Sequence, residues 1–197
     1  MACTALGRGR QLNCNRISGG INSVYFAVLD QVASIQYDTT AAPNGIRMIN
    51  DIDMGTNSLY KYALPLGTSS LTDTIVGSRE NGTVYYTPTI NIIYNRLSKE
   101  DQQEIKLLAS TKTIVFAQLN QQLTNGHDVI VAMGMVNGME LNAGTMDSGA
   151  AWGDRNGYTL TFDGMEADPF AMVQDYTATP FDNVDSGAAI PIVSTGL

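Results

Sequence analysis

The sequence offers few side chains that could carry out covalent or metal chemistry. His127 is the only histidine, and Cys3 and Cys14 are the only cysteines. A structural zinc site needs four soft ligands close together, and nucleophilic catalysis by a serine needs a positioned histidine. His127 follows Asn125-Gly126 and is expected to be a solvated turn residue. We therefore predict no catalytic, metal-binding or cofactor-binding residues and no cofactor.

The Gly/Arg-rich start of the chain allows two interpretations of Cys3 and Cys14. A disulfide between them cannot be deduced from the sequence, and free thiols are the preferred interpretation for a protein made in a cytoplasm. The same stretch carries Arg8, Arg10 and Arg16. Because no aromatic residues are interleaved with these arginines, a structural arm is favoured over a nucleic-acid contact.

Two acidic patterns could bind a cation or do acid–base work. Asp51 and Asp53 would point the same way from a strand, but glycoside chemistry also needs an aromatic-lined cleft that the sequence does not show. "DRNGYTLTF" begins like a calcium loop, yet Tyr158 stands where the third oxygen ligand belongs. We expect a hairpin turn at Asn156-Gly157 and a protein that is not an enzyme.

Turn signals and apolar runs predict the elements that would position any site. Asn-Gly, the strongest short-range hairpin signal, occurs at Asn44-Gly45, Asn81-Gly82, Asn125-Gly126, Asn137-Gly138 and Asn156-Gly157. The intervening runs predict strands at 22–29, 58–64, 82–95, 112–119, 127–135 and 158–165. Pro88 makes the strand at 82–95 either an edge or a bulged strand, because proline cannot donate to a ladder.

One segment, "LSKEDQQEIKLLAS" at 97–110, favours a helix. Ser98 is a good N-cap, and Glu100 and Asp101 lie in the first turn, where the helix dipole favours acids. The apolar residues of this helix are expected on one face, packed on a sheet. They are Leu97, Ile105, Leu108 and Ala109.

The predicted fold is a single all-β-dominated domain, a β-sandwich or barrel-like arrangement over 1–197, with one amphipathic helix at about 98–110. Extended arms are expected at 1–20 and 175–197, the second ordered only against a partner. The stretch 38–57 is expected to be a long loop. The longest mainly apolar run, 129–136, is far shorter than a membrane helix needs, so we expect a soluble protein without a membrane anchor.

The charge is unevenly distributed along the chain. Only 15% of the residues are charged, and the net charge of −8 arises entirely after residue 138, where nine acidic residues accompany Arg155 as the only base. An acidic surface repels nucleic acid. Two interpretations stay open, since these acids either serve solubility or form a functional acidic lining.

The order of elements over 82–173 resembles that of the tube proteins of phage tails and related contractile systems. A long strand precedes the helix "LSKEDQQEIKLLAS", further strands "KTIVFAQL" and "HDVIVAMGMVNGMELNAG" follow, and "DSGAAWGDRNGYTLTFDGMEADPFAMV" supplies a closing strand. The opening "GRQLNCNRISGGINSVYFAVL" also resembles the start of virion structural proteins. The resemblance covers about half of the chain.

This resemblance implies a virion structural protein that is made in the host cytoplasm and located in the tail. Six copies would form a ring, rings would stack into a tube, and DNA would pass through the lumen without specific binding. Chain termini and a long loop, for which 38–57 is the candidate, would join neighbouring rings. Other tail proteins, with sheath, tape measure and baseplate proteins as candidates, would be partners. The alternatives are a tail adaptor or completion ring protein and a host-surface-binding β module of a tail fibre or baseplate.

Under this interpretation the strand at 158–164 should present one face to the channel. Strands alternate their faces, so Tyr158, Leu160 and Phe162 are expected in the core. The opposite face carries the candidate channel-facing residues Thr159, Thr161 and Asp163.

Overall fold

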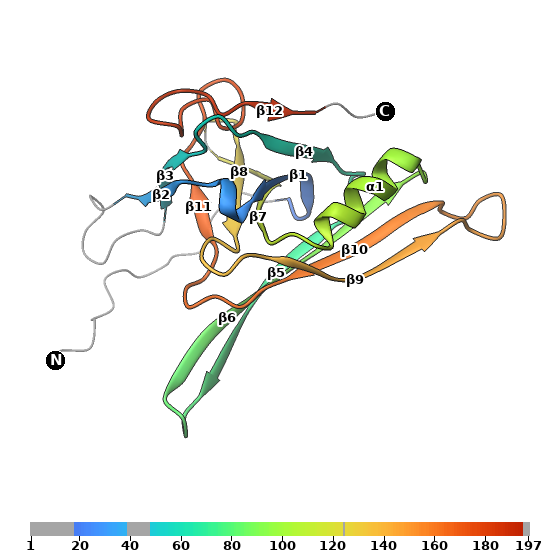
Figure 1. Cartoon of the computed structure of the whole chain (residues 1–197), viewed down its shortest axis with the longest axis horizontal. Coiled ribbons are helices and arrows are strands. Elements are labelled where there is room, and N and C mark those ends of the chain that lie inside the picture. The colour runs from blue at the N-terminus through green and yellow to red at the C-terminus, as the bar shows by residue number, and fades with distance from the viewer. Residues whose placement is uncertain (1–17, 39–47, 124, 195–197) are drawn as a thin grey trace.

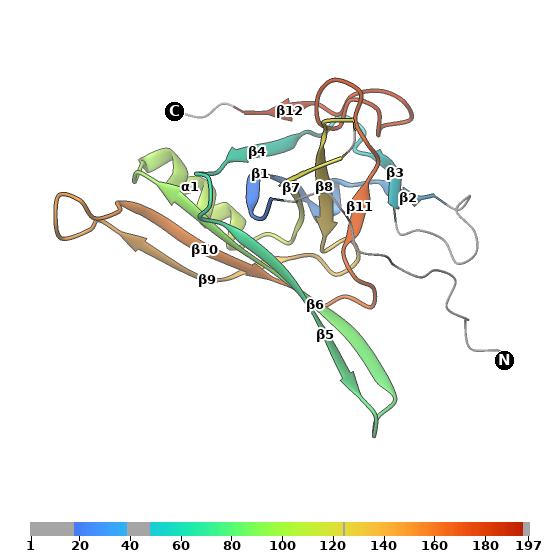
Figure 2. The same ribbon diagram turned by 180° about the vertical axis from the view of Figure 1, so that it is seen from behind.

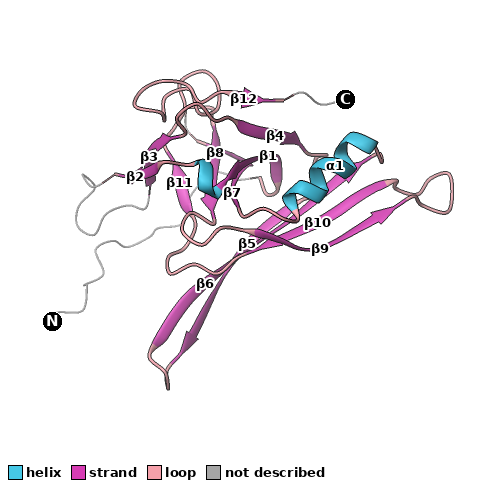
Figure 3. Cartoon of the chain, in the orientation of Figure 1, coloured by secondary structure: helices cyan, strands magenta, loops and turns pink. Residues whose placement is uncertain are grey.

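The structure, a computed structural model, describes residues 18–38, 48–123 and 125–194. Strands dominate these residues, which contain one α-helix and one short 3-10 helix, Leu29–Gln31 (Figure 3). The strands form two separate sheets. The all-β-dominated fold class is therefore confirmed.

The larger sheet, sheet A, has eight strands in the order β12-β4-β1-β7-β8-β11-β3-β2. Their bounds are β1 Ile21–Val28, β2 Ser34–Tyr37, β3 Met48–Asp53, β4 Leu59–Ala63, β7 Thr113–Gln122, β8 Asp128–Met133, β11 Ala171–Val173 and β12 Ile192–Val193. The smaller sheet, sheet B, has the order β5-β6-β10-β9 and is antiparallel throughout. Its strands are β5 Ser70–Ser78, β6 Thr83–Asn95, β9 Glu140–Asp147 and β10 Gly157–Asp163.

The central strands of sheet A are buried on both faces. In β1, Val24 and Phe26 belong to one hydrophobic core, whereas the alternating Tyr25 and Ala27 belong to another. Strands β7 and β8 divide their apolar residues between the two cores in the same way. This double burial explains why these strands read as nearly continuous apolar runs.

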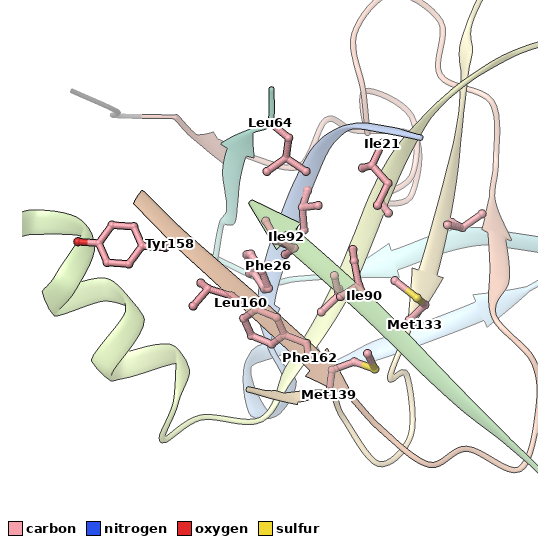
Figure 4. Close-up of a cluster of buried hydrophobic side chains, with 14 of the residues drawn as sticks. Ile21, Phe26, Leu64, Ile90, Ile92, Met133, Met139, Tyr158, Leu160 and Phe162 are labelled. Atoms are coloured by element: carbon pink, nitrogen blue, oxygen red, sulfur yellow. The ribbon is translucent and has the colours of Figure 1, made fainter. Parts of the chain in front are cut away.

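The first core lies between sheet A and sheet B, with α1, Lys99–Leu108, beside it. Side chains of both sheets meet there: Phe26 and Met133 from sheet A, Ile90 and Phe162 from sheet B (Figure 4). The strands of sheet B extend beyond the region that packs against sheet A. The β5–β6 hairpin and the β9–β10 hairpin project beyond the body at opposite ends (Figures 1 and 2).

Helix α1 begins as the sequence predicts. The Ser98 side chain accepts a hydrogen bond from the Asp101 N–H at 3.0 Å, which satisfies one of the donors left free at a helix start. The apolar face is narrower than expected, because among the four predicted residues only Ile105 is buried and Leu108 is half-buried. The helix thus covers its neighbours incompletely.

The second core is closed by the C-terminal segment, residues 174–194, which corrects one prediction. Phe181, Val184 and Ile190 are buried in this core, and β12 pairs in parallel with β4. Residues 175–194 are irregular, as expected of an arm, but this chain itself holds them. The expectation that they become ordered only against a partner is wrong, whereas 1–17, with Cys3 and Cys14, lie outside the described residues.

The predicted loop at 38–57 is also shorter than expected. Its second half contains β3, which pairs with β2 and buries Ile49 and Ile52 completely. These two residues are three apart because the β2–β3 register shifts at Gln36 and Tyr37, so β3 lacks the clean alternation that would identify a strand. Residues 39–47 lie outside the described residues.

Three of the five predicted Asn-Gly turns are confirmed, and the one at 156–157 is wrong. Gly82, Gly126 and Gly138 have positive φ angles in turns, whereas Asn44-Gly45 lies outside the described residues. Gly157 instead starts β10, and the β9–β10 hairpin turns through the longer loop 148–156. Glycine is required at 157 because a Cβ there would lie 1.9 Å from the Tyr94 carbonyl oxygen.

The role of the C-terminal segment predicts a large effect of Phe181→Ala. The Phe181 ring packs edge-on against Tyr25 and Phe116, with centroids 5.0 and 5.3 Å away, respectively. Removing it should lower the free energy of unfolding by about 3–5 kcal/mol, measured by denaturant titration. Leu66→Ala, at a residue 77% exposed, is the control and should change stability by less than about 0.5 kcal/mol. Equal effects of the two variants would contradict the packing role of this segment.

Candidate functional site

The outward side of sheet B, here called the open face, contains the residues predicted to face a channel. Tyr158, Leu160 and Phe162 of β10 are buried in the first core. The alternating residues Thr159, Thr161 and Asp163 are half-buried and lie on the opposite side. The predicted alternation of β10 is therefore present, and sheet A covers only one side of this strand.

Strand register extends the open face across all four strands and makes it rich in hydroxyl groups. Thr159 lies opposite Thr145 of β9, and Asp163 lies opposite Thr89 of β6. The threonines that share this face are Thr72, Thr74, Thr83, Thr87, Thr89, Thr145, Thr159 and Thr161. Threonine suits such a surface because it favours strands and forms hydrogen bonds without adding charge.

The four strands of sheet B contain no lysine or arginine. Asp163 lies on the open face, where its carboxylate accepts a hydrogen bond from the Asn142 side chain at 2.9 Å. Glu140 forms a 3.2 Å ion pair with Lys112, which lies outside the sheet. Asp73 lies on the other side, where it accepts the Phe170 N–H. The open face is thus weakly acidic.

Arg155, which lies at one end of this face, is held in place. Arg155 donates to the Thr159 hydroxyl at 2.7 Å and to the Tyr158 carbonyl oxygen at 3.0 Å. These bonds fix its guanidinium against the start of β10. From the sequence, Arg155 could be recognised only as an isolated base, because its hydrogen-bond partners depend on how loop 148–156 folds.

The projecting β5–β6 hairpin exposes apolar side chains. Ile75 is 68% exposed and Val84 is 62% exposed. Both lie on the side of sheet B that, nearer the body, faces the first core. Gly82, at the tip, has a φ of 62°. These two aliphatic side chains therefore contact solvent where the hairpin extends beyond the body.

Loop 148–156, at the other end of sheet B, has a defined shape. The Asp154 carboxylate accepts the backbone N–H groups of Ala150 and Ala151 at 3.0 and 2.7 Å, respectively, and Asp147 accepts that of Gly149. The two backbone hydrogen bonds lower the pKa of Asp154. The loop carries Trp152, whose side chain is fully exposed.

The other candidate residues serve structure in the described part of the chain. His127 is not simply solvated, since its ring stacks on Tyr176 with centroids 4.4 Å apart. Asp51 accepts the Ser186 N–H and Asp53 that of Gly55, so both carboxylates hold loops. No group of three or more potential metal ligands occurs in the described ranges.

Sequence reasoning missed Glu166, which is buried at 3% exposure. One of its carboxylate oxygens accepts the N–H groups of Val136 and Asn137 at 3.1 and 2.9 Å, respectively, and its backbone bridges to Tyr86 of β6. Glu166 therefore joins the turn after β8 to sheet B. No local pattern in the sequence distinguishes it from a surface glutamate.

No protein-family model, curated protein or solved structure matches the chain. Neither helix within the described ranges has the length and apolar character that crossing a bilayer requires.

The capping role of Asp154 can be tested with Trp152, the only tryptophan in the chain. Because the folded-state pKa of Asp154 is lowered, its carboxylate should be ionised to a greater extent at pH 4 than that of an ordinary aspartate, which is about half protonated there. Fluorescence anisotropy decay of Trp152 should therefore show restricted local motion at pH 7 and, for most of the molecules, at pH 4. Asp154→Ala should show faster local motion at both. Unchanged motion in this variant would contradict the capping role.

Proposed function

We propose that this protein is a virion structural protein whose copies form the stacked hexameric rings of a phage tail tube, the conduit for DNA ejection. The observation that carries the proposal is sheet B, a long four-stranded sheet with a hydroxyl-rich open face, no base within its strands and two available edges. The resemblance over 82–173 supports the same function.

The edges of sheet B suit a ring. Among the described residues, no strand pairs with the outer edge of β5 or of β9. Since four antiparallel strands alternate in direction, β5 and β9 run in opposite directions. A β5 from a neighbouring copy, related by rotation, would therefore add to β9 as an antiparallel strand. Repeating this contact around the ring would close a barrel in which the open faces of all copies lie on the same side of the barrel wall.

The chemistry of the open face suits a DNA conduit. DNA is held by lysine and arginine contacts to its phosphates, and each contact adds to salt-dependent affinity. A lumen lined by threonine hydroxyls and Asp163 would offer no free cation along the strands. DNA would pass such a surface without being retained.

The remaining partners follow from the resemblance. Sheath, tape measure and baseplate proteins are the candidates, and the exposed apolar residues of the β5–β6 hairpin are available for contacts between subunits or rings. The protein would be made in the host cytoplasm and located in the virion tail. No enzymatic activity is part of this function.

Electron microscopy of the purified protein tests the proposal directly. We expect rings or long tubes with a central hole, at a protein concentration where sedimentation shows large assemblies. Single rings that never stack would favour an adaptor or completion ring protein. A strictly monomeric protein at high concentration that binds a glycan would favour a host-surface module and would sink the tube proposal.

Asp163→Lys tests which face lines the lumen. Tubes should still form, because Asp163 is half-buried on the open face and outside both cores. One lysine per copy should retain DNA at low salt, with an affinity that falls about as the 0.9 power of salt concentration for each phosphate neutralised. DNA retention by isolated tubes and the ejection rate from phage particles measure this effect.

The matched control for this variant is Asp30→Lys, which makes the same charge change at an exposed residue of the 3-10 helix. It should leave DNA retention and ejection unchanged. If Asp163→Lys tubes assemble normally and eject DNA at the wild-type rate at every salt concentration, the open face does not line the lumen.

A further inference from the structure

A surface hollow lies between α1 and β4. Its volume is about 670 Å³, and its walls are mainly aromatic and aliphatic side chains, with Tyr62, Leu64, Tyr94, Ile105 and Leu108 among them. A second hollow of about 330 Å³ adjoins the first and shares Tyr60, Tyr62, Glu104 and Leu108 with it. The narrow apolar face of α1 leaves this space open, since only Ile105 of the helix is fully buried.

The polar groups that line the hollow include acceptors for an incoming donor, together with the ammonium group of Lys61. Glu104 lines both parts, and its exposed side chain forms no ion pair or hydrogen bond with the described residues. The Tyr94 hydroxyl is buried without a hydrogen-bond partner in the described part of the chain. A group with a large apolar surface and one N–H donor would match these walls, because burying such a donor without an acceptor is costly.

Trp152 is a side chain of this kind, and its loop presents it to solvent. Indole combines a large apolar ring with a single N–H donor. The loop backbone is held by Asp147 and Asp154, so the backbone loses less conformational freedom when Trp152 binds. The tip from Ala150 to Gly153 is uncharged, so it can approach Glu104 without a like charge.

The register of sheet B places loop 148–156 and the hollow at the same end of the sheet. Gly157, at the start of β10, pairs with Asp147 at the end of β9 and with Asn95 at the end of β6, just before α1. Strand β5 also starts at this end, since Ser70 pairs with Asn91. The residues that precede β5, including Leu64 and Pro65, line the hollow.

We propose that Trp152 of one copy inserts into the hollow beside α1 of the next copy around the ring. The inference rests on the proposed function. If β9 of one copy pairs with β5 of the next, the loop that follows β9 lies beside the neighbour's Leu64 and Pro65. The edge pairing therefore brings the exposed indole to the hollow.

Trp152 acts in this arrangement as the anchor of a larger interface. An aromatic side chain buries about 150–250 Å², whereas a stable interface buries about 800 Å² on each partner. The strand pairing supplies most of the remaining area. A tryptophan that is buried in a hollow and surrounded by weaker contacts is a common pattern of an energetic hot spot.

The fluorescence of the only tryptophan reports the contact in the full-length protein. In dilute, unassembled protein, Trp152 should be readily quenched by iodide. In assembled rings its emission should shift to shorter wavelength and iodide quenching should fall. Trp152→Ala should raise the concentration needed for assembly about thirtyfold, the effect of losing an interface hot spot.

Two variants test the hollow itself. Ala63→Phe adds bulk at an exposed residue that lines the hollow, and Ala178→Phe makes the same change at an exposed residue outside it. Glu104→Lys replaces the acceptor, with Gln103→Lys as its control on the same helix. In Ala63→Phe and Glu104→Lys, assembly should need a higher concentration and Trp152 should stay accessible to iodide. Both controls should match the wild-type protein.

The outcomes separate this inference from the proposed function. Rings in which Trp152 stays fully accessible, or is equally protected in Ala63→Phe and Glu104→Lys, would overturn the inference and leave the ring intact. Slower hydrogen exchange in β4 and α1 on assembly, with Trp152 still accessible, would mean that another segment fills the hollow and would also overturn it. A protein that never assembles, as judged by microscopy and sedimentation, would overturn both proposals.

Discussion

The burial of sheet A on both faces is the constraint on which the rest of the structure depends. Strands β1, β7 and β8 carry apolar side chains on alternating sides, so the sheet needs two covers. Sheet B and α1 cover one face, and the C-terminal segment covers the other. Because sheet B serves as a cover, it buries only one of its own sides. Its open face is left for another purpose.

The elements with strong local signals were predictable from the sequence. Ser98 marks the start of α1, and the apolar runs mark the strands of the cores. Strand β5 escaped prediction because half of it lies beyond the body and exposes residues such as Ile75, so its pattern is mostly polar. The C-terminal segment escaped for a different reason. Phe181 and Val184 project into the second core from irregular backbone, where no periodicity exists to be read.

The candidate site was predictable only one strand at a time. Alternation within β10 identifies Thr159, Thr161 and Asp163, because a strand's two sides follow from sequence alone. The neighbours of these residues depend on strand register, which joins Asp163 to Thr89 from a strand about seventy residues earlier. Sequence reasoning therefore found three residues of a surface that spans four strands.

The hydrogen-bond partners of the acidic residues in the C-terminal part of the chain show what several of these residues do. Asp182 accepts the backbone N–H groups of Thr177, Ala178 and Thr179, and these bonds hold its pKa well below the ordinary value. Asp154 caps loop 148–156 in the same manner, and Glu166 is buried. These three carboxylates thus hold backbone segments in place. For a surface that a polyanion must pass, the decisive property is the absence of bases from the strands of sheet B. Lysine and arginine are absent from each of four separate strands. The net charge of the chain does not reveal this absence, which becomes apparent only when the strand register shows that the four strands form one surface.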